Sequence, residues 1–128
     1  MTEISLSLET IVLIVEDEPF TAVSLEMNLR DLGSQQVHIV RTPEIALAFL
    51  ETRTPILAFV DWQLGDNTSE TVVAKLRDLG VGIILMSGYS EIPNLTPWAG
   101  YTILAKPFGD HELHAAIASA MNSKGAAQ

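Results

Sequence analysis

The sequence has no cysteine and few basic residues, and both shortages exclude classes of protein. Without cysteine, the 128 residues can form no disulfide, no thiolate metal site and no cysteine nucleophile. Seven lysines and arginines against sixteen acidic residues give a formal net charge of −9, which argues against a surface that binds nucleic acid directly. No apolar run is long enough to span a bilayer, and the first residues lack the positive charge of a secretory signal. We therefore expect a cytoplasmic protein that makes no membrane contact.

Apolar residues are abundant, at 48% of the chain, which is enough for one sizeable core. Short apolar runs alternate with segments of helical periodicity, the pattern of βαβ units in a parallel sheet covered by helices. The predicted buried strands span residues 11–15, 37–40, 56–60, 83–86 and 103–105. We expect one domain over residues 11–122, preceded by an N-terminal extension over 1–10 and followed by a flexible tail over 123–128.

Capping and stop signals bound the first two predicted helices. Pro19 suits a first helical turn, and Gly33 is expected to end that helix. Thr42 and Pro43 form the cap and first turn of the second helix. The first helix is expected to pack a broad apolar face on the core, made of Phe20, Val23, Leu25, Met27, Leu29 and Leu32.

The later helices are less uniform in their signals. Asn67 and Glu70 have the spacing of a capping box, and Gly80 is expected to close the helix that follows. Asp110 is expected to cap the last helix. Two prolines fall between residues 90 and 100, so only a short or broken helix fits there.

Polar residues follow four of the predicted strands. Glu16 and Asp17 follow the first, Asp61 the third, Ser87 the fourth and Lys106 the fifth. Because ligands of open α/β sheets bind outside the carboxyl ends of the strands, these side chains are expected to converge on one site. Carboxylates, a hydroxyl and an ammonium group are suited to a divalent cation and a phosphoryl group.

Four motifs resemble the receiver domain of two-component response regulators. They are Val15-Glu16-Asp17-Glu18-Pro19, Val60-Asp61-Trp62-Gln63-Leu64, Met86-Ser87-Gly88 and Ala105-Lys106-Pro107-Phe108. The resemblance covers roughly residues 11–121, and it extends to single-domain receivers with a Gly-Tyr step after the fourth strand. It implies an α/β fold of the (βα)5 flavodoxin-like type, a doubly wound parallel sheet with strand order 2-1-3-4-5.

The resemblance also implies a phosphoacceptor. Asp61 would accept a phosphoryl group from a histidine kinase or a histidine phosphotransfer protein, forming an aspartyl phosphate that signals to a downstream protein. Lys106 would pair with the phosphoryl group, and Ser87 would donate a hydrogen bond to it. Such a protein is a switch with self-phosphorylation and autodephosphorylation chemistry, and not an enzyme acting on other substrates. In the family the bond between Lys106 and Pro107 is cis.

The implied cofactor is Mg²⁺. Asp17 and Asp61 would bind it through carboxylate oxygens, and the backbone carbonyl of Gln63 would add a ligand. Glu16, one methylene longer than aspartate, would hold a metal-bound water. The usual aromatic residue on the fifth strand is replaced by Ile103, which puts the usual rotamer switch in doubt.

Two other classes of function bear comparison. A haloacid-dehalogenase-type phosphatase also uses an aspartate after a strand, but it carries a second aspartate two residues on, where this chain has Gln63. A pseudo-receiver that binds partners without phosphorylation is the main alternative, although such a module should have lost part of the acidic set or the lysine. The sequence is compatible with a stand-alone switch, a phosphorelay carrier or a module of a longer chain.

Overall fold

The computed structural model of the chain describes residues 6, 9–64, 67–88 and 100–126. The short or broken helix predicted over residues 90–100 lies outside the described residues, except for Gly100. No helix in the described ranges combines the length and apolar character needed to cross a membrane.

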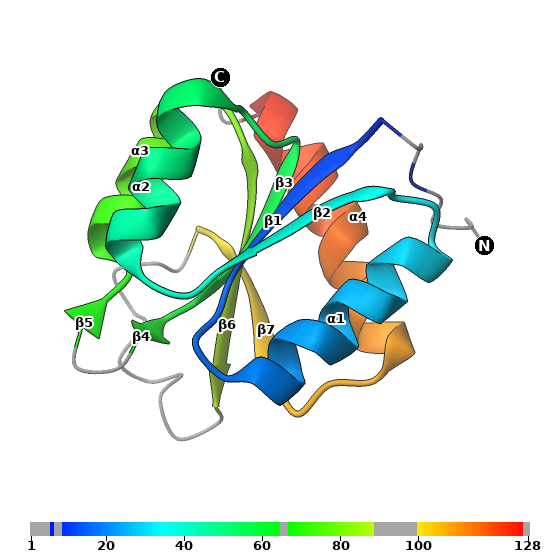
Figure 1. Ribbon diagram of the computed structural model, residues 1–128. Helices are drawn as coiled ribbons and strands as arrows, with labels where there is room; N and C mark the ends of the chain where they lie inside the picture. Colours follow the sequence, from blue (N-terminus) through cyan, green and yellow to red (C-terminus); the bar gives the residue numbers. More distant parts are fainter. Residues whose placement is uncertain (1–5, 7–8, 65–66, 89–99, 127–128) are drawn as a thin grey trace.

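A parallel sheet of five strands forms the centre of the molecule, in the order β2-β1-β3-β6-β7 (Figure 1). This order confirms the predicted 2-1-3-4-5 arrangement and the flavodoxin-like α/β class. The strands are β1 (Ile11–Val15), β2 (Gln36–Val40), β3 (Leu57–Asp61), β6 (Gly82–Gly88) and β7 (Thr102–Lys106). A separate pair of short strands, β4 (Gln63–Leu64) and β5 (Asn67–Thr68), forms an antiparallel hairpin directly after β3.

Helices cover both faces of the sheet, so the central strands are buried on both sides. The helices α1 (Pro19–Asp31) and α4 (Asp110–Ala126) lie on one face, and α2 (Pro43–Thr52) and α3 (Glu70–Asp78) lie on the other (Figure 1). Along β1, Val12 and Ile14 belong to the core under α1 and α4, while Leu13 and Val15 belong to the core under α2 and α3. This double burial explains why the strands read as continuous apolar runs. Helix α4 continues to Ala126, into the segment 123–128 where a flexible tail was expected.

Most of the predicted helix ends are confirmed. The Thr42 hydroxyl accepts a hydrogen bond of 3.1 Å from the backbone N–H of Ile45, as a helix cap does. Gly33 and Gly80 follow α1 and α3 with φ of 120° and 75°, conformations that side-chain-bearing residues rarely adopt. The N-cap of α1 is Glu18, whose carboxylate accepts from the backbone N–H of Thr21 at 2.9 Å.

Two predicted caps are wrong. Asn67 is part of β5, and the residue at the N-cap position of α3 is Ser69. The hairpin after β3 uses Asn67 for strand pairing, so the helix begins later than the capping-box spacing suggested. Asp110 is the first residue of α4 and not its cap; the backbone N–H of the preceding Gly109 donates to the Glu112 side chain at 3.0 Å.

The apolar face predicted for α1 is only half used by the core. Ala22, Leu25 and Leu29 are buried. By contrast, Phe20 is 78% exposed, Val23 49% and Met27 62%. A helix lying on a sheet buries one stripe of its surface, and the predicted face was wider than that stripe. An apolar stripe of Phe20, Val23 and Met27 therefore faces away from the core.

Candidate functional site

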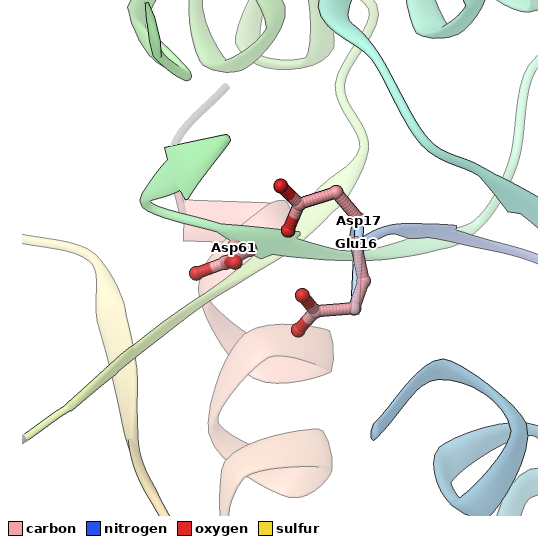
Figure 2. Close-up of side chains that lie close together, drawn as sticks. All are labelled: Glu16, Asp17 and Asp61. Atoms are coloured by element: carbon pink, nitrogen blue, oxygen red, sulfur yellow. The ribbon is translucent and has the colours of Figure 1, made fainter. Parts of the chain in front are cut away.

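Three carboxylates meet at the carboxyl ends of the two central strands β1 and β3. Glu16 and Asp17 follow β1, and Asp61 is the last residue of β3. Each of the three offers an oxygen that lies within 4.8 Å of the other two. Figure 2 shows the side chains of Glu16 and Asp17 beside the end of the strand that carries Asp61. The structure thus brings together the three acidic residues that were predicted to converge.

The chemistry of this donor set fits a hard divalent cation. The three ligands are all carboxylates, with no nitrogen or sulfur donor among them. Mg²⁺ prefers oxygen ligands at roughly 2.0 to 2.1 Å, so two ligands on opposite sides of the ion lie about 4 Å apart. The three carboxylate oxygens all lie within 4.8 Å of one another, so small side-chain adjustments would allow them to hold Mg²⁺.

Lys106, the last residue of β7, supplies the positive charge of the site. Its ammonium nitrogen Nζ lies 3.1 Å from Glu16 Oε1 and 3.5 Å from Asp61 Oδ1. The peptide bond between Lys106 and Pro107 is cis, as the resemblance implied. Lys106 therefore reaches from the edge strand β7 to two of the three carboxylates, which lie at the ends of the inner strands β1 and β3.

The Glu16 carboxylate is buried and held by two donors. Oε1 accepts from Lys106 Nζ, and Oε2 accepts from the backbone N–H of Glu18 at 3.1 Å. Only 1% of Glu16 is exposed, whereas Asp17 is partly exposed. Glu16 is therefore positioned to hold Lys106 in place, and Asp17 is the more accessible of the two acids beside Asp61.

Burial, together with a neighbouring negative charge, makes Asp61 an unusually weak acid. Burial, followed by the negative charge of Glu16, raises the pKa of Asp61 to about 7. Lys106 and a hydrogen bond from the backbone N–H of Gln63 act in the opposite direction but do not cancel the effect. For Lys106, burial opposes the charge, but the Asp61 and Glu16 carboxylates outweigh it and raise the lysine pKa. In the absence of a cation, Asp61 is thus close to half protonated at neutral pH.

Ser87 and Gly88 end β6, the strand between β3 and β7. Asp61 is in register with Met86, and Lys106 is in register with Gly88, so Ser87 lies between the two charged residues along the edge. Ser87 is fully buried, and its hydroxyl donates to the carbonyl of Gly88 at 3.2 Å. The four strand ends predicted to form the site are therefore neighbours.

Ser69 is a site residue that sequence reasoning missed. Its buried hydroxyl hydrogen-bonds to the carbonyl of Asp61 and, at 3.1 Å, to the carbonyl of Trp62. In the sequence, a serine directly before a helix is an ordinary capping signal, so nothing in the pattern separates it from a plain cap. Only its hydrogen bonds connect it to Asp61.

Ile103, which replaces the aromatic residue usual in the family at this position, is half-buried on β7. It packs at the margin of the core under α2 and α3. It also lines a groove of about 490 Å³ between β7 and α4, together with Leu104, Ala116 and Ser119. The groove does not include the acidic cluster.

The fold and the acidic site together define a class of α/β signalling domain, and comparisons with known proteins agree. The response regulator receiver domain family matches residues 12–118. The phyllosphere-induced regulator PhyR of Methylorubrum extorquens is 31% identical over 124 residues, which cover 93% of this chain and 46% of that protein. The chain therefore belongs to the response regulator receiver domain family.

Solved structures give the same result. The response regulator PhyR from Brucella abortus is 30% identical with a TM-score of 0.80, covering 97% of this chain and 51% of that one. SdrG from Sphingomonas melonis Fr1 is 31% identical with a TM-score of 0.80, covering 91% of this chain and 99% of that one. The chain thus spans about half the length of both PhyR relatives, and nearly all of SdrG.

The raised pKa of Asp61 predicts a pH-dependent effect of replacing it. A raised folded-state pKa contributes stability that is fully present below the unfolded value near pH 4 and is lost as pH rises through about 7. In metal-free buffer, Asp61→Asn should therefore stabilise the protein by about 2 kcal/mol at pH 8, since each pKa unit corresponds to about 1.4 kcal/mol and Lys106 loses one partner. Near pH 4 the gain should be small. Urea unfolding with EDTA at both pH values measures it.

The matched control is Asp78→Asn, because the Asp78 side chain on α3 is 71% exposed. This variant should change the unfolding free energy little at either pH. Equal effects of Asp61→Asn at pH 4 and pH 8 would show that carboxylate crowding is not the cause.

Proposed function

We propose that the protein is a phosphoacceptor of a two-component or phosphorelay system and that Asp61 carries the phosphoryl group. The observation that supports this most is the position of Asp61, flanked by Asp17 and Glu16 and lying 3.5 Å from the ammonium of Lys106. A carboxylate attacks a phosphoryl group only where the negative charges of both are neutralised. The cluster provides one positive charge, the ammonium group of Lys106, and a set of carboxylate ligands for a divalent cation.

The phosphoryl donor would be a phosphohistidine of a histidine kinase or a histidine phosphotransfer protein. An Asp61 oxygen attacks phosphorus, a new O–P bond forms, and the P–N bond to the imidazole breaks. The imidazole nitrogen takes the electron pair and a proton. Lys106 turns from Asp61 toward the phosphoryl oxygens, and the Ser87 hydroxyl donates a hydrogen bond to one of them.

Mg²⁺ would be held by Asp17 and Asp61, with the backbone carbonyl of Gln63 as a further ligand. When bound, the ion neutralises charge on the carboxylates and the phosphoryl oxygens. Glu16 is occupied by Lys106 and by the backbone N–H of Glu18, which suits a role in orienting the lysine and a metal-bound water.

The exposed apolar stripe on α1 suits the docking of the phosphodonor. Phe20, Val23 and Met27 lie at i, i+3 and i+7, so they form one side of the helix. Helix α1 begins at Pro19, shortly after Glu16 and Asp17, so a helical partner packed along the stripe would reach the edge of the sheet that carries the acidic cluster. A separate protein would then read the phosphorylated state.

Phosphorylation can be tested with a small donor. Phosphoramidate and Mg²⁺ should add one phosphoryl group to the wild-type protein, and intact-mass analysis detects it. Asp61→Asn should remove the labelling, while Asp78→Asn should be labelled normally. Wild-type protein that takes up no phosphoryl group would instead support a pseudo-receiver that binds partners without phosphorylation.

The docking surface makes a separate prediction. Phe20→Ser should slow phosphotransfer from any histidine kinase that labels the wild type, by about tenfold or more, because an exposed aromatic anchor is lost. Its labelling by phosphoramidate should be unchanged. Ile45→Ser, at a 52% exposed position on α2 over the opposite face of the sheet, is the matched control. Equal slowing of phosphotransfer by both variants would show that the stripe is not part of the docking surface.

A further inference from the structure

Ser69 occupies the cap position of α3 but does not act as a cap. No hydrogen bond joins its side chain to the first turn of the helix. Its hydroxyl instead hydrogen-bonds to the Asp61 and Trp62 carbonyls, eight and seven residues earlier in the chain. Serine at this position normally stabilises the helix by accepting from a backbone N–H. A residue that forms distant hydrogen bonds in place of the helix cap its sequence position favours is expected at functional sites.

The peptide that Ser69 contacts is the one that follows the phosphoacceptor. The Trp62 backbone is held on two sides. Its N–H donates to the carbonyl of Met86 at 2.9 Å, and its carbonyl also accepts from the backbone N–H of Ser69 at 3.2 Å. Ser69 is fully buried, so water does not compete for its hydroxyl. The exit from β3 is thus fixed against β6 on one side and against Ser69 on the other.

The next residue along the chain is Gln63, and two of its groups matter to the site. Its backbone N–H hydrogen-bonds the Asp61 carboxyl group, and its carbonyl is the proposed metal ligand. Gln63 pairs with Thr68, the residue before Ser69, across the hairpin. Ser69 thus holds the chain just before Gln63, through the Asp61 and Trp62 carbonyls, and directly follows Thr68, the strand partner of Gln63. The position of Gln63 relative to Asp61 therefore depends on Ser69.

We propose that Ser69 is a positioning residue for the phosphoacceptor site, which holds the Asp61–Gln63 backbone in the geometry needed for Mg²⁺ binding and phosphoryl transfer. The proposal rests on the proposed function. In this role Ser69 acts through its hydrogen bonds to the backbone carbonyls of Asp61 and Trp62, and not as a ligand of the cation or the phosphoryl group.

The test compares two serines that are buried equally. Ser34 is also fully buried, and its hydroxyl donates to the carbonyl of Thr10 at 2.8 Å, before the start of β1 and far from the carboxyl ends of the strands. Ser69→Ala and Ser34→Ala should both lower the unfolding free energy, because each leaves a carbonyl without its donor. Only Ser69→Ala should weaken Mg²⁺ binding, measured by calorimetry, and slow labelling by phosphoramidate at saturating Mg²⁺, each by about tenfold.

Conservative variants separate positioning from folding. Ser69→Thr keeps the hydroxyl and should recover most of the Mg²⁺ affinity and labelling rate. Ser69→Cys keeps the size but donates only weakly, so it should behave like Ser69→Ala and replaces it if the alanine variant does not fold. Wild-type Mg²⁺ affinity and labelling in both Ser69→Ala and Ser69→Cys would overturn the positioning role. Failure of the wild-type protein to bind Mg²⁺ or to be labelled would instead overturn the proposed function.

Discussion

The burial of Asp61 beside the Glu16 carboxylate, at the end of the sheet, is the constraint on which the rest of the site depends. Burial and the neighbouring Glu16 charge raise the pKa of Asp61 to about 7, even with the Lys106 ammonium 3.5 Å away. One lysine shared between two carboxylates leaves the cluster short of positive charge. A divalent cation would relieve this unfavourable charge, so the proposed Mg²⁺ binding and the proposed reactivity of Asp61 would have the same electrostatic origin.

The fold produces this crowding through its topology. A parallel sheet gathers the carboxyl ends of all its strands at one edge, and the order β2-β1-β3-β6-β7 makes the strands of Glu16 and Asp61 direct neighbours. Apolar side chains pack on both faces of these strands, so the backbone positions that carry the carboxylates are fixed next to one another. Helix α1, which carries the exposed stripe of Phe20, Val23 and Met27, begins three residues after Glu16 at this same edge.

The sheet and the charged residues could be predicted from the sequence because doubly buried strands give unbroken apolar runs, and the polar residue that ends each run marks its carboxyl end. The hairpin after β3 could not be predicted, since its strands of two residues have no periodicity to detect. Asn67 therefore resembled a cap, and the role of Ser69 was hidden. The exposure of Phe20 was missed because periodicity identifies apolar residues on a helix without showing how wide a stripe the sheet covers.

The most direct test of this account is the titration of the Asp61 carboxyl group, followed by carbon NMR of protein labelled at the aspartate side chains and assigned with Asp61→Asn. In metal-free buffer the Asp61 resonance should titrate with a midpoint near pH 7. Saturating Mg²⁺ should move this midpoint well below neutrality, because the cation favours the ionised carboxylate. A midpoint near pH 4 that is the same with and without Mg²⁺ would contradict both the crowding of the carboxylates and their role in binding the metal.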